Sequence, residues 1–315
     1  MARSVKLGLL AVAALGLAAL FLFGGAGGNW DYILPRRGVK VTAIALTGCA
    51  IAYATALFQT IANNRILTPN MIGFDAMYLL IQTAVVFVYG SAALTRLGEN
   101  ANFALSVGAM VGFAWLLYKF LFRKEERHVY YVLLAGVIMG TLFGSMTTFM
   151  QVMIDPNEFF IVQDRMFASF NNVNAEVLAL AAAAIVAATL YSLRFARDLD
   201  AIALGRDQAI GLGVPYERVV KQSLVVVAVL VSASTALVGP IAFLGLLVVN
   251  TAVQLMGTFR HRWIVPSSAL VAVVALLGGQ LLVERVFTFS TTLSVIVNFA
   301  GGIYFLYLLL KENAK

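Results

Sequence analysis

The chain has 315 residues, of which 61% are hydrophobic and only 12% are charged, and its formal net charge is +7. A soluble domain is nearer one quarter charged, so this composition excludes a soluble protein and predicts an all-α, polytopic membrane protein. In a membrane chain the positive balance reflects orientation more often than binding to nucleic acid, which we do not expect as a partner.

Apolar runs recur along the whole length, and a crossing needs about 20 residues. They predict about ten transmembrane helices, over residues 5–25, 40–62, 70–90, 101–122, 129–153, 175–193, 219–239, 241–256, 264–283 and 294–310. The run at 241–256 is short and follows Gly239-Pro240, which ends the preceding helix. We expect it to be tilted or buried among its neighbours, because lipid does not tolerate freed backbone groups.

The chain is therefore predicted to be a single transmembrane domain over 1–315, and its longest stretches outside the spans are 154–174 and 194–221. In the first of these, Asp155-Pro156-Asn157-Glu158 predicts a capped short helix. Within the spans, glycines recur every four residues at Gly136, Gly140 and Gly144, and again at Gly108 and Gly112. Such ridges indicate close packing of helices in lipid.

The segment 194–221 is the longest internal stretch rich in charge. Asp198 or Asp200 can cap a short helix that has Leu199 and Ile202 on one side. Helices this short are unstable alone in water, so they need a surface to dock against. The pattern is compatible with docking of a soluble partner and also with a plain polar loop between membrane helices.

Gly205 ends this first helix, and a second turn or two follows. We expect Ala209 and Leu212 to form an exposed apolar pair before Gly213 and Pro215 stop the helix.

The distribution of Lys and Arg predicts the orientation. A cytoplasmic N-terminus leaves six of the 22 on the outer side, namely Arg36, Arg37, Lys40, Arg96, Arg165 and Arg285. The remaining 16 lie inside, so the positive-inside rule places both termini and the segment 194–221 in the cytoplasm.

Chemistry of its own is not expected from this chain. The single Cys49 and the distant His128 and His261 give no metal site, and no phosphate-binding Gly-x-x-x-x-Gly-Lys-Ser/Thr motif occurs. No nucleophile–base constellation emerges either, so we predict a subunit that is not an enzyme.

A spaced pattern in the inner segment resembles a known family. Leu204-Gly205, Ala209 and Leu212-Gly213-Val214-Pro215 are similar to the coupling segment of the permeases of type II ABC importers, which carry iron–siderophore complexes and vitamin B12. Further matches follow in the family's order over about 280 residues, at Leu34-Pro35-Arg36, Asn64 to Gly73, Gly239 to Leu246 and His261-Arg262.

Several positions depart from the family's pattern. Val249-Asn250 stands where Pro-His is usual, Leu293 to Ile296 differs from Leu-Pro-x-Gly, and Arg65 replaces a proline. Asp75 takes a place where small polar residues are common. These changes resemble the siderophore branch that often supplies one half of a pair of different permeases, which makes vitamin B12 a less expected cargo.

The resemblance implies a permease that imports a ferric siderophore, of catecholate type, across the inner membrane of a bacterium. Haem or cobalamin cargo, or an ion-coupled secondary transporter, are the alternatives. The implied partners are two ATPase subunits, which bind ATP and Mg²⁺, a substrate-binding protein, and a second permease that is a copy or a paralogue. The chain itself would bind no cofactor.

The resemblance also implies roles for single residues. In the coupling segment, Ile202, Leu204 and Leu212 would fill a groove of the ATPase, with Arg206 and Asp207 at its rim. The full set of expected coupling residues is Leu199, Ile202, Leu204, Gly205, Arg206, Asp207, Ala209, Leu212 and Gly213.

On the outer face Arg36 and Arg285 are expected to receive acidic residues of the binding protein, although snorkelling at helix ends is the plain alternative. Glu284 could be an internal counter-ion of Arg285 instead. A third outer arginine of the family is missing where Ile33 stands, or has moved to Arg37.

The loop before the third span is expected to contribute to an inner gate, through Asn63, Asn64, Met71 and Asp75. An ionisable side chain in a membrane segment is a functional candidate by default. Asp75 could line the cytoplasmic exit, or it could cap the third span through a free backbone amide.

Overall fold

The computed structural model describes residues 2–25, 30–121 and 129–313, and within these ranges it is helical, without strands. The remaining residues include His128 and four of the cations used to predict the orientation, namely Arg123, Lys124, Arg127 and Lys315.

Ten long helices correspond one to one with the predicted spans. They are α1 (Arg3–Phe23), α2 (Trp30–Ala62), α3 (Phe74–Tyr89), α4 (Ala92–Leu121), α5 (Val129–Met153), α7 (Ala175–Ser192), α10 (Tyr216–Val238), α11 (Leu244–Met256), α12 (His261–Arg285) and α13 (Leu293–Asn313). The described part of the chain contains seven helices that are long and apolar enough to cross a membrane, and α3, α11 and α13 add three shorter apolar helices. The prediction of ten spans is confirmed.

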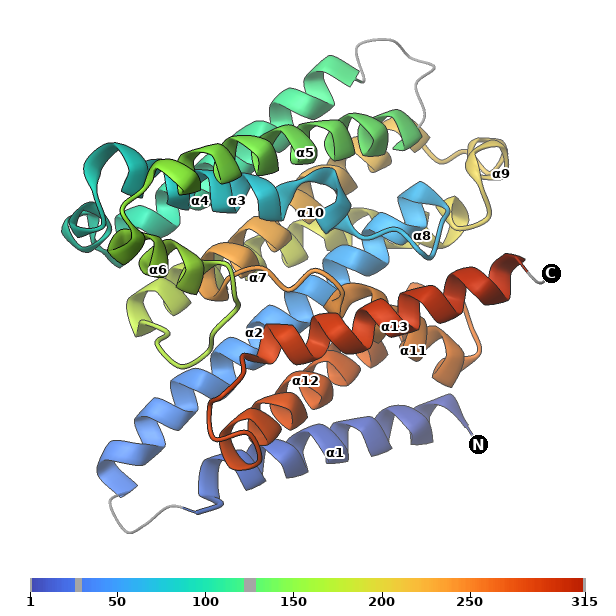
Figure 1. The fold of residues 1–315 in the computed structure, drawn as a ribbon. Coiled ribbons are helices and arrows are strands. Elements are labelled where there is room, and N and C mark those ends of the chain that lie inside the picture. Colours follow the sequence, from blue (N-terminus) through green and yellow to red (C-terminus); the bar gives the residue numbers. More distant parts are fainter. Residues whose placement is uncertain (1, 26–29, 122–128, 314–315) are drawn as a thin grey trace.

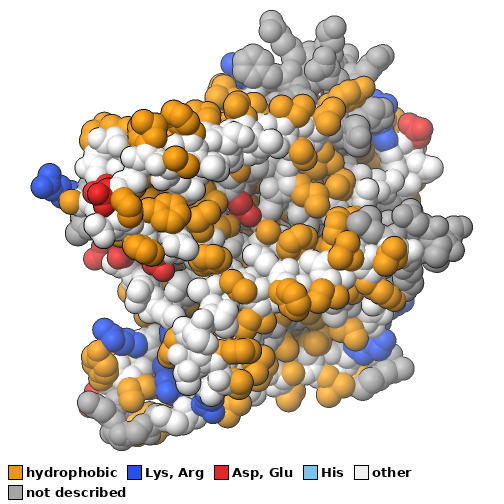
Figure 2. Space-filling view, in the orientation of Figure 1, with side chains coloured by type: hydrophobic (Ala, Val, Ile, Leu, Met, Phe, Trp, Pro, Cys, Tyr) orange, Lys and Arg blue, Asp and Glu red, His pale blue; other side chains and the backbone are white. Residues whose placement is uncertain are grey.

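Short helices fill the connections. They are η1 (Pro69–Ile72), α6 (Pro156–Arg165), η2 (Leu193–Phe195), α8 (Ala196–Ile202) and α9 (Arg206–Gly211). Both chain ends and α8–α9 lie at one end of the bundle, while α6 lies at the opposite end (Figure 1). Hydrophobic side chains dominate the face shown in Figure 2, and Lys and Arg gather toward the ends of the helices. We call the end with α8 and α9 the inner end.

Helix α2 runs through the centre of the bundle, and most of its buried residues are small. At Gly48 an added Cβ would lie 3.2 Å from the Leu276 side chain and 3.3 Å from Ala272 Cβ, so α12 packs almost directly on the α2 backbone. Close approach of this kind is how small residues join helices in lipid. The helix begins at Trp30, ten residues before the predicted start at 40, and it continues through Pro35.

Two breaks beside membrane helices fall at glycines that have positive φ, and a third such glycine, Gly98 (φ 71°), kinks α4 near its start. Gly73 (φ 96°) separates η1 from α3, and Gly239 (φ 98°) ends α10 before α11. A side chain is disfavoured in this conformation. An added Cβ at Gly239 would meet the Ala168 backbone at 3.0 Å, so both breaks are enclosed by protein rather than lipid, as freed backbone groups require. The short α11 is mostly buried, as predicted.

Two of the three glycines in the predicted ridge on α5 pack closely against another segment. Gly136 and Gly140 face the backbone of Ile72 and Gly73, whereas a methyl group added at Gly144 would have no neighbour within 4 Å. Gly108 and Gly112 on α4 also have open space around them, so the expectation of close packing there is wrong within the described chain.

Cations hold both ends of α1. At the inner end, Lys6 Nζ donates to Leu255 O at 2.6 Å and Arg3 donates to Met256 O at 3.3 Å, which caps the C-terminus of α11. At the outer end, Arg37 donates to three carbonyls at the end of α1, including Gly24 O at 2.9 Å. Cations at helix C-termini satisfy carbonyls that have no partner inside the helix and complement the helix dipole.

A substitution on the glycine ridge tests this packing. In Gly136→Ala the new methyl would lie 2.6 Å from Ile72 Cα, so backbone must move. We expect the purified protein to lose about 1–3 kcal/mol of stability, measured by thermal unfolding in detergent. The matched control is Gly144→Ala on the same helix, which meets nothing within 4 Å and should be neutral or slightly stabilising. Equal stability of the two variants would contradict the packing.

Candidate functional site

The coupling segment consists of α8 and α9, joined by a turn at Gly205, which has φ 110° and precedes α9. Helix α8 follows η2 directly, and no side chain caps it. The expectation that Asp198 or Asp200 caps this helix is therefore wrong. Asp200 caps another helix instead, because its Oδ1 accepts from the backbone N–H of His261, at the start of α12, at 2.9 Å.

Apolar side chains of this segment point in two directions. Leu199, Ile202 and Ala209 are buried in the bundle of the chain itself, whereas Leu204 and Leu212 are 61% and 65% exposed. The expectations that Ile202 fills a partner's groove and that Ala209 is exposed are therefore wrong. The side chains of α8 turn toward α2 and α12, and that tertiary contact sets the helical phase.

Polar and apolar side chains share the free face of the segment. Arg206, Asp207 and Gly213 are exposed beside the two leucines. Ile210, which sequence reasoning missed, is also exposed and lines a shallow groove together with Tyr216. Its position next to the buried Ala209 was the signal that could have found it, since neighbouring helix residues face different ways.

The inner loop between α2 and η1 lies close to the coupling segment. Asn63 adopts a positive φ of 48°, and Asn64 Oδ1 accepts from the Ile66 backbone N–H at 2.9 Å, so this side chain shapes the turn. Both asparagines are exposed. The Arg65 carbonyl accepts from Gln59 Nε2 at 2.7 Å, which ties the loop to α2.

Asn250 on α11 also contributes to this region, although from the sequence it stood out only as a departure from the family's pattern. Its Nδ2 donates to the Arg65 carbonyl at 3.1 Å, so it ties the inner loop to α11. A polar side chain in the middle of an apolar run was the signal that marked it.

Asp75 sits in the first turn of α3, but it does not cap that helix. The N-cap position is Gly73, and no side chain bonds there, so the capping alternative is wrong. Asp75 Oδ2 accepts from Asn70 Nδ2 at 2.9 Å, and Asp75 Oδ1 has no hydrogen-bond partner among the described residues. Met71 is half-buried and packs on the hydrophobic core.

The two predicted docking arginines lie at the outer end. Arg36 is exposed, with its guanidinium 4.7 Å from the centre of the Tyr32 ring, and Arg285 is exposed at the end of α12. The Arg285 guanidinium lies against Gly24, whose carbonyl also accepts from Arg37. These side chains are therefore grouped around the outer end of α1.

Two neighbours of this outer group have partners within the chain. Arg37 donates through Nη1 to three carbonyls of α1, and its replacement of the family's third arginine stays a prediction. Glu284 is the counter-ion of Lys40, at 2.8 Å, and not of Arg285. Gln280 Nε2 also donates to Glu284, at 3.0 Å, which leaves the carboxylate well satisfied.

The outer segment 154–174 contains the predicted capped helix, α6. Asp155 accepts from the Asn157 backbone N–H at 2.8 Å, as the sequence predicted. At its start Glu158 accepts from the Ser91 backbone N–H at 3.1 Å, and at its end Arg165 hydrogen-bonds the Tyr78 hydroxyl. Helix α6 is thus pinned to α3 and to the turn that follows it.

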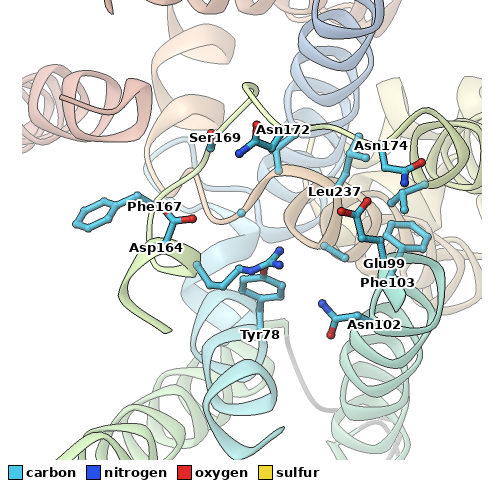
Figure 3. A pocket seen from close by; sticks show the side chains of 15 residues that line it. Tyr78, Glu99, Asn102, Phe103, Asp164, Phe167, Ser169, Asn172, Asn174 and Leu237 are labelled. Atoms are coloured by element: carbon cyan, nitrogen blue, oxygen red, sulfur yellow. The ribbon is translucent and has the colours of Figure 1, made fainter. Parts of the chain in front are cut away.

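A polar cavity of about 250 Å³ opens behind α6, between α3, α4, α7 and the end of α10 (Figure 3). Its charged members are Glu99, Asp164 and Arg165, and amides such as Asn102 and Asn172 point into it. Sequence reasoning missed this group, because its members come from segments far apart in the chain. The polar run at the start of α4 was the available signal.

Within the described ranges, no three His, Cys, Asp or Glu side chains gather in a way that could hold a metal ion. Cys49 is half-buried in α2, and the His261 ring lies between Asp200 and Thr60 at the inner end of the bundle.

Comparison with known proteins is consistent along the whole chain. The FecCD transport family matches residues 4–311. The chain is 54% identical over 313 residues to the petrobactin import system permease protein YclO of Bacillus subtilis (strain 168), with 99% of both chains covered. It is 34% identical over 282 residues to the petrobactin import system permease protein FatC of Bacillus anthracis, covering 90% of this chain and 80% of that protein.

A solved structure of a metal-chelate type ABC transporter in an inward-facing conformation has the same fold. It superposes with a TM-score of 0.86 at 20% sequence identity, and the match covers 98% of this chain and 100% of the other. The chain belongs to the FecCD transport family and has the fold of a type II ABC importer permease.

Proposed function

We propose that this chain is the permease subunit of an ATP-driven importer that carries a ferric siderophore across the cytoplasmic membrane of a bacterium. The observation that carries the proposal is the construction of the coupling segment. Leu199 and Ile202 anchor it in the bundle, while Leu204 and Leu212 face away from the bundle. A soluble subunit that grips these leucines would move the helices to which the segment is anchored.

The orientation follows from charge. The inner end carries α8, α9 and both termini, and the positive-inside rule assigns the end with most of the Lys and Arg to the cytoplasm. Two ATPase subunits, which bind ATP and Mg²⁺, would dock there. A substrate-binding protein would dock at the opposite end, on Arg36 and Arg285.

The cargo is inferred from the relatives. The proteins at 54% and 34% identity are both named for petrobactin import, and FepD of Escherichia coli, named for ferric enterobactin transport, is 26% identical. A catecholate-type ferric siderophore, with petrobactin first, is therefore the cargo to test. HmuU of Yersinia pestis, named for hemin transport, is 25% identical, which ranks haem behind it.

We place the cargo path along the open side of α5, with a second permease, a copy or a paralogue, closing the other side. Thr141, Ser145 and Thr148 are exposed at helical spacing on this side, and their hydroxyls donate to carbonyls of the same helix. Such a row presents polar oxygens without unpaired donors. Asn63, Asn64, Met71 and Asp75 remain our proposed inner gate.

Uptake in cells tests the proposed function. A strain that lacks this chain should lose growth on ferric petrobactin as the single iron source and keep growth on ferric citrate or haem. Reintroduction of the chain together with its ATPase should restore uptake of radiolabelled iron, and substitution of the ATPase's catalytic residues should abolish it. Uptake that persists without any ATPase would point to an ion-coupled transporter instead.

A double substitution tests the coupling surface. Leu204→Ala with Leu212→Ala removes the two exposed side chains, so we expect the affinity for the ATPase to fall at least about tenfold, as for buried anchors of an interface. Co-purification and ATPase titration in nanodiscs measure this. The matched control is Leu193→Ala, which is also 61% exposed but lies in η2, outside the segment. An unchanged affinity in the double variant would exclude the surface.

Charge reversal tests the outer face. Arg36→Glu with Arg285→Glu should slow association of the binding protein by about tenfold or more at low salt, with a smaller effect at high salt, because surface charge acts mainly on the on-rate. Surface plasmon resonance on the reconstituted complex gives the rates. Arg96→Glu, an exposed arginine on α4, is the control for charge alone. Equal rates for all three proteins would leave snorkelling as the role of these arginines.

A further inference from the structure

A chain of hydrogen bonds joins the coupling segment to the inner end of α2. Asp200, on α8, accepts through Oδ1 from both His261 Nδ1 (2.7 Å) and the His261 backbone N–H (2.9 Å). On the other side of the ring, His261 Nε2 lies 2.7 Å from Thr60 Oγ1. Three helices, α8, α12 and α2, are connected through a single imidazole.

The chemistry of the three side chains constrains which atoms donate and which accept in these hydrogen bonds. A carboxylate only accepts, so His261 Nδ1 carries the hydrogen in that bond. The Thr60 hydroxyl has a single hydrogen and two neighbours, His261 Nε2 at 2.7 Å and the Ala56 carbonyl, to which it donates at 2.8 Å, so Thr60 joins the ring to the preceding turn of α2. The imidazole is buried, with only 9% of its side chain exposed, whereas the Asp200 side chain is 45% exposed. Both bonds are short and fix the ring orientation.

The position of Thr60 connects this series of hydrogen bonds to the inner loop. Thr60 lies one turn before Asn63 and Asn64, and its neighbour Gln59 holds the Arg65 carbonyl. The inner loop is therefore fastened to the same turn of α2 that receives the ring. A cavity of about 230 Å³, lined by Thr60, His261 and Asn63 among others, gives this region room to rearrange.

We infer that Asp200, His261 and Thr60 form a link that transmits movement of the coupling segment to the inner loop. They act as positioning residues for transport: Asp200 moves with α8, and the imidazole carries the displacement to α2. Leu199 and Ile202 anchor α8 by burial, and the hydrogen bonds add contacts of defined length and angle between α8, α12 and α2. The inference rests on the proposed function, in which an ATPase moves α8.

The test compares transport with hydrolysis in one preparation. The complete transporter, with its ATPase and second permease, is reconstituted in proteoliposomes with binding protein loaded with ferric petrobactin. Iron imported and ATP hydrolysed are measured together. Thr60→Val removes the hydroxyl at nearly constant volume, and Asp200→Ala removes the acceptor of both His261 bonds. We expect hydrolysis to stay within about twofold while iron imported per ATP falls about fivefold or more, the usual scale of coupling between sites.

Controls separate a link from a merely structural role. Thr60→Ser keeps the hydroxyl and should restore the wild-type ratio, and Asp198→Ala makes the same truncation on α8 at a residue that does not bond His261. The double variant Thr60→Val with Asp200→Ala should be no worse than either single variant, because both break the same series of hydrogen bonds.

Two outcomes would overturn the link: an unchanged ratio of iron to ATP in Thr60→Val and Asp200→Ala, or an equal loss in Asp198→Ala. Failure of the proposed function looks different. There the unsubstituted complex would import no iron and would show no stimulation of hydrolysis by loaded binding protein, and both ideas would fall together.

Discussion

The contact on which the functional assignment depends is the burial of Leu199 and Ile202 against the bundle. A helix of seven residues does not persist alone in water. Burying two large aliphatic side chains supplies roughly 3–6 kcal/mol, which is enough to hold such a helix in place. Because the anchoring side chains point inward, the remaining apolar residues of the segment are left on the outside. The same short helix pair is thus anchored to the bundle through one side and carries the proposed docking surface on the other.

The broken helices meet a related constraint. A membrane helix can be interrupted only where protein encloses the freed backbone groups. Gly73 and Gly239 both have φ near +100° and both lie against the backbone of another segment, η1–α3 against α5 and the end of α10 against the outer loop. One break therefore lies against α5, and the other lies against the outer segment 154–174, at Phe167 and Ala168. Glycine is needed there for the backbone angle and also for the close approach.

Much of the fold was predictable because it depends on local chemistry. Span positions follow from apolar length, and the cap of α6 follows from Asp155 and its next two residues. The phase of α8 and α9 was not predictable, since in a helix of one or two turns the buried side is decided by distant neighbours. The same limit explains Arg37, whose carbonyl partners lie at least 13 residues away in the chain, and Glu284, whose ionic partner Lys40 lies 244 residues away. It also explains Asn250, which bonds a carbonyl 185 residues distant.

Helix α1 has only two fully buried residues, Ala14 and Phe21, and it packs along α12. Its two ends are fastened as well, by Lys6 at the end of α11 and by Arg37 of α2 at its own end. Each of these basic clasps ties the first helix to an element from another part of the chain, so α1, α2, α11 and α12 form one connected unit. During a transport cycle the first helix must travel together with that unit, and a rearrangement that parts α11 from α1 must first break the two basic clasps at the inner end.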